Sequence, residues 1–457
     1  QIFIAEGYKA GTLPPQALAE RFVLDMAVDI QGRQQLRMWQ GTFYRYRGTK
    51  YEAISGQDLQ LTIASWLKGI NERVTNSLVR DVVLNVQAAC HIGSDKCPPC
   101  WLGVVPERMG TIMSFRNCLL DVSDTAAGFP EMYPHTPELF STQSVPYDFE
   151  LMAECPTWDA FLNEIFRGDQ ERINLLQEWF GYHLDPTMRL EKHAIFLGDG
   201  ANGKSVVLAV LRALVGKENA TAIPLDKLGD RFQVAQLSGK VANIVADLED
   251  TGLAAEGLLK MLISCEPVTG EFKNKDTFTF VPTARHTFAA NTFPCFRDTS
   301  GGTWRRILLL PFDYVVPEDK REPGLAERII GNEMPGIFNW AMYGLKRLKS
   351  AWKFTPSTSC DETLKVYRGQ CNTVQAFVEE RCLVAANACV PTSAIYDAYV
   401  AWCKNSGHGK RSQSVFGREL RRLVPGLAIA RPTVASGTRT NVYSGLALKD
   451  PGCTPWR

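Results

Sequence analysis

The chain has 457 residues, 45% of them hydrophobic, and its 50 Lys and Arg against 49 Asp and Glu give a formal net charge of +1. This length predicts about three domains, and the balanced charge argues neither for nor against a nucleic-acid partner. No apolar run reaches the roughly 18 residues of a membrane helix, and the amino terminus lacks a signal-peptide pattern. We therefore expect no membrane partner, and because the chain begins at Gln1 rather than Met, we expect it to belong to a longer protein.

Thirteen cysteines are scattered along the chain, which is typical of a reducing compartment rather than of a disulfide scaffold. One group, Cys90, His91, Cys97 and Cys100, has the ligand types of a zinc site. Two prolines stiffen the segment between Cys97 and Cys100, and the spacing to Cys90 is unusual for zinc. Unpaired thiols in a loop are the favoured interpretation, and zinc stays open as the alternative.

Residues 1–150 form the first predicted unit, an α+β accessory domain. Alternating aromatic and polar residues over 36–55, broken at Gly48, predict a β-hairpin. Residues 58–70 have helical spacing, and residues 113–122 are typical of a strand followed by a turn. The residues of this unit indicate no chemistry of their own.

Residues 151–352 form the second predicted unit. Apolar residues recur with helical spacing over 155–166 and 170–184, which predicts two amphipathic helices, the first with Thr157 as its N-cap. A short buried strand follows, and after a glycine-rich loop comes a helix that Gly216 ends.

The loop between that strand and helix fits the pattern G-x-x-x-x-G-K-[ST]. Its glycines allow backbone N–H groups to point at phosphate oxygens, and the helix that begins there adds its positive dipole end. Lys204 would reach the β- and γ-phosphates of ATP, and Ser205 would ligate Mg²⁺. The alternative, a simple strand-to-helix turn, is disfavoured by the strand and helix on either side. The predicted nucleotide-binding residues are Gly198, Gly200, Asn202, Gly203, Lys204 and Ser205.

Carboxylates crowd the end of a predicted strand over residues 242–246, where Asp247, Glu249 and Asp250 follow one another closely. Such crowding is costly unless a cation offsets it, so we expect Asp247 to help hold Mg²⁺. An isolated segment of this kind is more often a solvated loop. Its position about forty residues after the glycine loop favours the metal interpretation.

Another apolar strand ends in Asn291, whose amide could hydrogen-bond a water molecule or the γ-phosphate; a turn-forming Asn is the alternative. Arg305 and Arg306 precede a further buried strand. One of them could reach a neighbouring subunit's nucleotide as an arginine finger, and we favour Arg306. The alternative for these arginines is a surface salt bridge.

Residues 373–457 form the third predicted unit, after a predicted linker over 353–363. From Lys404 to Arg439 the chain has eight Lys or Arg and one acid, Glu419, so the near-neutral chain contains a basic patch. The helix over 412–424 would present Arg418, Arg421 and Arg422 to DNA and bury Phe416, Leu420 and Leu423. Helix-turn-helix followed by two strands suits a duplex groove, and a module used only for protein contacts is the alternative.

The series "GDGANGKS", "IVADLE", "GEFKNKDTFTFVP", "FAANTFP" and "WRRILLLPF" resembles the superfamily 3 helicases. It is similar in particular to the phage and plasmid primase-helicase family that includes the poxvirus primase-helicase. "FRNCLLDV" and "LQEWFGYHLDP" resemble the domain that precedes the motor, and "SVFGRELRRLVPGL" the start of its C-terminal winged helix. The resemblance thus covers nearly the whole chain.

This resemblance implies an α/β fold with an AAA+-like P-loop motor core, a helical lead-in and a C-terminal winged helix. Such motors assemble as rings, usually hexamers, around single-stranded DNA. By motif, Asp247 and Glu249 match the acidic Walker B pair, although its first position is more often Glu, and Asn291 matches sensor 1. Lys273 and Lys275 match the basic tip of a hairpin that points into the channel.

We therefore expect an ATP-dependent DNA helicase of phage or mobile-element replication, with single-stranded and forked DNA as partners. It would act in the cytoplasm of a bacterial host or of a virus-infected cell. The alternative is a DNA-binding regulator or initiator whose nucleotide hydrolysis switches assembly without strand separation. No primase metal site is apparent, so primer synthesis, if any, is expected of a preceding domain or a partner.

Overall fold

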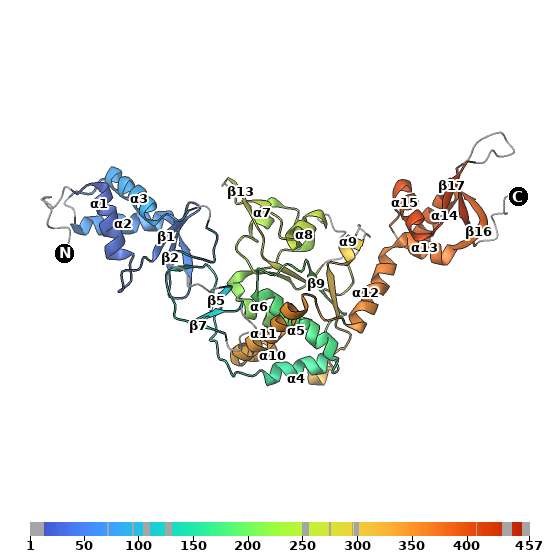
Figure 1. The fold of residues 1–457 in the computed structure, drawn as a ribbon, viewed down its shortest axis with the longest axis horizontal. Helices are drawn as coiled ribbons and strands as arrows, with labels where there is room; N and C mark the ends of the chain where they lie inside the picture. The colour runs from blue at the N-terminus through green and yellow to red at the C-terminus, as the bar shows by residue number, and fades with distance from the viewer. Residues whose placement is uncertain are drawn as a thin grey trace.

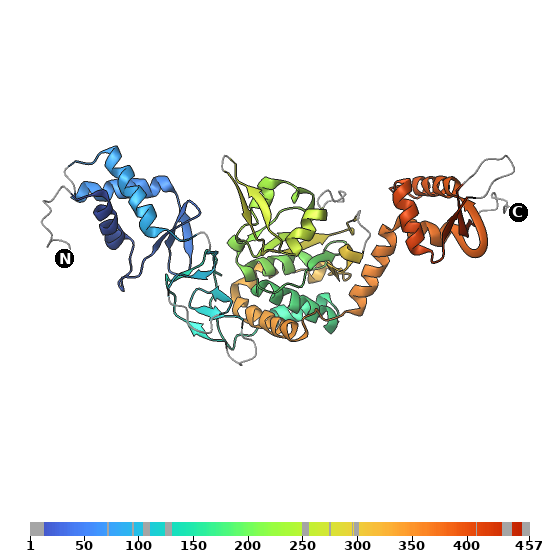
Figure 2. The same ribbon diagram turned by 45° about the horizontal axis from the view of Figure 1, so that its top comes forward.

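The computed structural model describes residues 13–70, 73–93, 96–103, 110–123, 130–248, 256–273, 276–294, 296, 301–407, 409–431 and 441–449. Figure 1 shows three parts in a row: an N-terminal group of helices and strands, a central part built on a sheet, and a C-terminal group reached through one helix. Figure 2, turned by 45°, shows the same row. Within the described residues, no helix combines the length and the apolar character needed to cross a bilayer.

The N-terminal part packs helices α1 (Pro15–Met26), α2 (Gly56–Ile70) and α3 (Asn76–Cys90) around one apolar core. Beside them, strands β1 (Leu36–Trp39), β2 (Thr42–Tyr46) and β3 (Tyr51–Ile54) form an antiparallel sheet in that order. The sequence predicts one hairpin here, and the structure has two. Gln40 and Gly41 both have positive φ, as the tight turns that join antiparallel strands require, but Gln is an uncommon residue in such turns.

Short strands connect this part to the centre. They are β4 (Cys100–Trp101), β5 (Ile112–Ser114), β6 (Leu119–Asp121), β7 (Met132–Tyr133) and β8 (Leu139–Phe140). The segment predicted as one strand and a turn over 113–122 is therefore the hairpin of β5 and β6.

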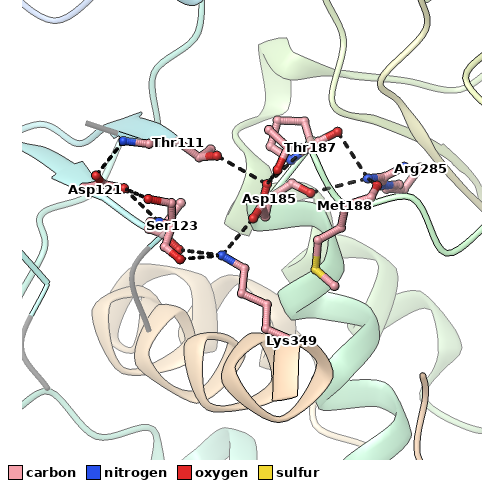
Figure 3. Close-up of polar contacts among 11 residues, drawn as sticks. Thr111, Asp121, Ser123, Asp185, Thr187, Met188, Arg285 and Lys349 are labelled. Carbon is pink, nitrogen blue, oxygen red and sulfur yellow. Dashed lines mark hydrogen bonds and ion pairs between the residues drawn. The ribbon is translucent and has the colours of Figure 1, made fainter. Parts of the chain in front are cut away.

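A buried polar network joins β5 and β6 to the centre (Figure 3). Lys349 forms an ion pair with Asp185 at 2.8 Å and donates to the backbone oxygen of Ser123 at 2.8 Å. The Thr111 hydroxyl donates to the same Asp185 carboxylate at 3.3 Å. Burial raises the pKa of Asp185, but the hydrogen bonds from Lys349 and Thr187 outweigh it, so the pKa lies below the ordinary value.

The central part holds a five-stranded parallel sheet in the order β10-β11-β14-β9-β15. Its strands are β9 (His193–Leu197), β10 (Ala220–Thr221), β11 (Ala242–Val245), β14 (Arg285–Ala290) and β15 (Ile307–Pro311). A hairpin of β12 (Val268–Glu271) and β13 (Thr277–Phe280) projects beside it (Figure 1). The central helices are α4 (Pro156–Ile165), α5 (Gln170–Leu184), α6 (Lys204–Val215), α7 (Arg231–Ala235), α8 (Glu256–Ile263), α9 (Gly301–Trp304), α10 (Leu325–Asn332) and α11 (Met334–Ala351).

The two predicted amphipathic helices are α4 and α5, but Thr157 is not the N-cap of α4. That position is Cys155, and no side-chain cap comes from it. The carboxylate of Glu333, which immediately precedes α11, accepts hydrogen bonds from the backbone N–H of Thr157 and of Trp158, both at 3.0 Å. The first turn of α4 is thus capped by a residue distant in sequence.

The predicted linker after Trp352 is largely helical, because α12 (Thr358–Cys371) begins within it. The N–H of Thr358 donates to the carboxylate of Glu171 at 2.9 Å, and Leu364 and Tyr367 pack against the central core. Beyond α12 lie α13 (Thr373–Arg381), β16 (Cys382–Pro391), α14 (Thr392–Asn405), α15 (Gln413–Leu423), β17 (Ala428–Ala430) and β18 (Val442–Leu448). These strands form an antiparallel sheet in the order β16-β18-β17, over a core of their own.

Candidate active site

Three segments meet at one edge of the central sheet, where the parallel strands β9, β14 and β11 end. The N–H of Gly198, just after β9, donates to the backbone oxygen of Ala290 at 3.1 Å. The N–H of Leu248, beyond β11, donates to the oxygen of Ala289 at 2.9 Å. Asn291 and Asp247 therefore lie beside the glycine loop, at the carboxyl edge where open α/β sheets bind their ligands.

Two positions of the loop require glycine, because atoms of neighbouring residues lie too close to leave room for a side chain. A Cβ on Gly198 would lie 2.2 Å from the backbone oxygen of Phe312, and a Cβ on Gly203 would lie 2.9 Å from the ring of Phe161. Gly203 also has a φ of +87°, which side chains rarely adopt. The backbone is thus packed against its neighbours in a shape that only glycine allows.

The segment after β15 holds the loop in place. The buried amide of Asn202 donates to the backbone oxygen of Phe312 at 3.0 Å, and the N–H of Val316 donates to the oxygen of Ala201 at 2.8 Å. Arg172, buried at the start of α5, fixes the same segment through Pro311 at 3.1 Å and Asp313 at 2.7 Å. The sequence analysis missed Arg172, because no local motif marks it.

Lys204 is the first residue of α6 and is 8% exposed. Its ammonium group donates to the backbone oxygen of Gly198 across the loop. Burial lowers the pKa of Lys204, and the carboxylates of Asp199 and Asp247 oppose this effect without cancelling it. The carboxylate of Asp247 is therefore close enough to interact electrostatically with the ammonium group of Lys204. The two residues follow β11 and β9, which both neighbour β14 in the sheet, and this strand order leads to their proximity. Ser205, Asp247 and Asn291 are exposed, and Glu249 lies outside the described residues.

A hollow of about 340 Å³ opens beside the loop, between α4 and the segment that leads into α10. Phe161, Gly203 and Ser205 line one side, and Arg321 and Arg328 line the other. The sequence analysis missed these two arginines, which lie in a charge-rich stretch without a recognisable pattern.

Arg305 and Arg306 lie at the opposite edge of the sheet, because they precede β15 and Ile307 pairs with His193, the first residue of β9. A five-residue strand is roughly 16 Å long, so neither side chain is beside the loop of its own chain. Arg306 is 14% exposed and forms an ion pair with Glu191 at 2.8 Å. Arg305 is exposed. Arg306 was favoured from the sequence as the arginine finger. The structure instead shows the alternative for this residue, a salt bridge.

The remaining predicted residues lie on two other surfaces. Lys273 is exposed beyond β12, and Lys275 lies outside the described residues. On α15, Arg418, Arg421 and Arg422 are exposed. Phe416 and Leu420 are buried, and Leu423 packs against the same core, as predicted.

The candidate zinc ligands are spread over different surroundings. Cys90 is buried at the end of α3, where burial raises the pKa of its thiol to about 11. His91 and Cys97 are exposed. Over the part of the chain that the structure describes, no group of three or more His, Cys, Asp and Glu side chains is arranged to hold a metal ion.

Comparisons with known proteins match three successive parts of the chain. A family described as D5 N terminal like matches residues 111–167, and a family of unknown function, DUF5906, matches residues 196–306. The RFX DNA-binding domain family matches residues 372–450.

Putative helicase 121R of Invertebrate iridescent virus 3 is 23% identical to this chain over 292 residues. The match covers 55% of this chain but only 30% of the viral protein. Two solved structures of the NrS-1 C terminal region cover all of their own chains and 94% and 96% of this one, with 14% and 13% identity and a TM-score of 0.49 in both cases.

The fold and the site define an α/β protein with a glycine-rich strand-to-helix loop at the carboxyl edge of a parallel sheet. The D5 match and the viral relative support the resemblance that the motifs predict: the chain is similar to viral proteins of the primase-helicase type. The RFX match relates its C-terminal part to DNA-binding domains.

Proposed function

We propose that this chain is the ATP-hydrolysing motor of a DNA helicase in phage or mobile-element replication. The observation that carries the proposal is the meeting of Lys204, Asp247 and Asn291 at one edge of the parallel sheet, beside the glycine loop. A buried cation, an exposed hydroxyl and an exposed carboxylate are the groups that bind a magnesium–triphosphate complex.

Each residue has a role in this proposal. Lys204 and the loop N–H groups bind the phosphates, and Ser205 with Asp247 would hold Mg²⁺, which offsets phosphate charge during transfer. Asn291 orients the attacking water, together with Asp247 or Glu249 as the activating acid. The nucleoside would occupy the hollow between α4 and α10, which opens directly from the loop.

The motor would work as a ring, a hexamer in this proposal. Arg305 is the residue proposed to reach the nucleotide of a neighbouring subunit, because it is exposed and far from the loop of its own chain. Lys273 and Lys275 would track the backbone of a single strand in the channel. The C-terminal part would bind duplex DNA as a winged helix through α15, which the match to a DNA-binding family supports.

Lys204→Ala tests the proposal, with Lys217→Ala as the matched control, since Lys217 is exposed beyond the other end of α6. We expect Lys204→Ala to abolish both ATP hydrolysis and the unwinding of a forked duplex, and the control to retain both. Unwinding by Lys204→Ala with ATP would refute the assignment. A wild-type chain that binds DNA in a nucleotide-dependent way, without separating strands, would favour the regulator instead.

A further inference from the structure

A second hollow, of about 470 Å³, lies where the β12–β13 hairpin meets α7. Its lining includes Phe272, Gln233, Gln236 and Lys240. It adjoins β10, the outermost strand of the sheet on that side, and so is distinct from the loop at the end of β9. The residues that bind the nucleotide in the proposed function contribute nothing to it.

The side chains of this hollow are complementary to a nucleobase. Phe272 is 43% exposed, so part of its ring is accessible to a ligand. The Gln236 amide nitrogen donates to the Gln233 side-chain oxygen at 3.3 Å. This pairing leaves one amide oxygen and one amide nitrogen to accept from and donate to a ligand. Lys240 adds a cation at the rim, and its ammonium group is anchored on the backbone oxygen of Glu218.

The hairpin that lines the hollow contacts α7 at several points. Gly270 lies so close to α7 that a Cβ there would be 2.8 Å from the Cα of Ala235. Arg231 on α7 forms an ion pair with Glu271 at 3.0 Å. The ring of Phe272 is stacked on Phe278, with centroids 5.1 Å apart and planes 15° apart. A stacked ring held in this way can receive a flat ligand on its other face without losing conformational freedom.

We propose that this hollow is a base-binding subsite for single-stranded DNA, in which an unpaired base stacks on Phe272 and its edge meets the amides of Gln233 and Gln236. The proposal rests on the proposed function, since it supplies the motor with a contact to bases in addition to the phosphate contacts of Lys273. Bases within a duplex are stacked on their neighbours, so only a single strand offers a free face. Aromatic stacking tolerates every base, which suits a motor that moves along any sequence.

The test compares two labelled strands of equal length and charge, a thymidine oligonucleotide and a strand of abasic sites, by fluorescence anisotropy with the full chain. Stacking of one base on an aromatic ring changes affinity by about tenfold. We expect wild type to bind the thymidine strand at least that much more tightly, Phe272→Leu to lose about tenfold of this preference, and Phe272→Tyr to restore it. Tyr343→Leu is the matched control, because Tyr343 is an exposed aromatic residue on α11.

A second readout is the emission of 2-aminopurine in the bound strand, which stacking on Phe272 should quench in wild type but not in Phe272→Leu. A Phe272→Leu chain that keeps the full preference and the quenching would overturn the subsite. Equal binding of both strands by wild type would also overturn it while leaving the proposed motor intact, whereas no binding of either strand would refute both. If Phe272→Leu fails to fold, we expect Gln236→Leu to lose the preference for the thymidine strand instead. Gln236 is exposed, so this substitution should not disturb folding.

Discussion

Two adjacent arginines at the start of β15 have different surroundings, and this difference assigns them different roles. Arg306 donates to the carboxylate of Glu191 at 2.8 Å and to the backbone oxygen of Gly302 at 3.0 Å. These contacts are internal, so its contribution is to stability. Arg305 has an exposed side chain, and its backbone oxygen accepts a hydrogen bond from Lys192. Of these two arginines, only Arg305 is exposed and could meet the proposed neighbouring subunit.

If the site is shared, two inactive variants should complement one another. Arg305→Ala and Lys204→Ala are each expected to reduce ATP hydrolysis by about 10³-fold or more. A mixed ring contains interfaces at which an intact Lys204 faces an intact Arg305. We expect mixing to restore a measurable part of the hydrolysis rate. Activity that stays at the level of the separate variants, in rings that demonstrably mix, would contradict a shared site.

Arg306→Ala is the control variant for Arg305→Ala. Loss of a partly buried ion pair should lower the free energy of unfolding by about 1–3 kcal/mol, whereas Arg305→Ala should leave it unchanged. Thermal unfolding of the two variants, measured side by side, tests whether Arg306 contributes to stability and Arg305 does not.

Helices α5 and α11 pack closely against each other. A Cβ on Gly181 would lie 2.4 Å from the backbone nitrogen of Leu345 and 2.6 Å from the oxygen of Ala341. A Cβ on Gly344 would lie 2.2 Å from the oxygen of Gln177. Because backbone atoms cannot move aside as a flexible side chain can, the two helices can approach this closely only with glycine at these positions.

Gly181→Ala should therefore force α5 and α11 apart and lower the free energy of unfolding by on the order of 1–3 kcal/mol. Gly69→Ala in α2 is the control, because nothing lies within 4 Å of its added Cβ. It should be neutral or stabilise the chain by about 0.5–1 kcal/mol. Urea unfolding of both variants measures the difference, and equal effects would contradict the close-packing argument.

The helix α15 presents its arginines on one face and its apolar residues on the other, so its contact with DNA is expected to be electrostatic in large part. Arg421 is partly engaged with the backbone oxygen of Gly417 at 3.0 Å, while Arg422 is exposed. Arg422→Ala should weaken duplex binding about equally for different sequences and reduce the slope of log K against log salt by about 1. A titration over several salt concentrations measures this slope, and an unchanged slope would remove Arg422 from the interface.

The stability of the folded chain should depend on pH through its buried histidines. Burial lowers the pKa of His183 and of His193 to about 3, and that of His286 to about 4. These side chains stay neutral in the folded chain, but in the unfolded chain they take up protons below their ordinary value of 6.5. The folded state is therefore most favoured above that pH and loses stability as the pH falls toward 4.

Each such histidine contributes a slope of up to about 1.4 kcal/mol per pH unit in this range. We expect the urea midpoint to be lower at pH 5 than at pH 7. His193→Phe should reduce this difference, because both ring nitrogens lack hydrogen-bond partners among the described residues and Phe288 and Phe296 surround the ring. A wild-type midpoint that is the same at both pH values would refute the assignment of neutral buried histidines.

Features that depend on a short window of residues could be predicted before the structure was known. Strand β9, the glycine loop and the helix that Gly216 ends were predicted in place, because buried strands, turns and helix ends have local patterns. The inward face of α15 was predicted for the same reason, since the spacing of apolar residues on a helix follows directly from backbone geometry. The β12–β13 hairpin agrees with the hairpin that the family resemblance implies.

Features that join distant segments could not be predicted in this way, because they depend on how the chain packs in three dimensions. Glu333 rather than Thr157 caps α4, contacts with the central core make the expected linker the helix α12, and Glu191 engages Arg306. The hollow beside Phe272 likewise depends on α7 lying against the hairpin. A residue's local propensity says nothing about which distant carboxylate or helix will meet it. Such contacts are fixed by the order and packing of the strands and helices. They are the reason why Arg306 is engaged in an ion pair whereas Arg305 is exposed.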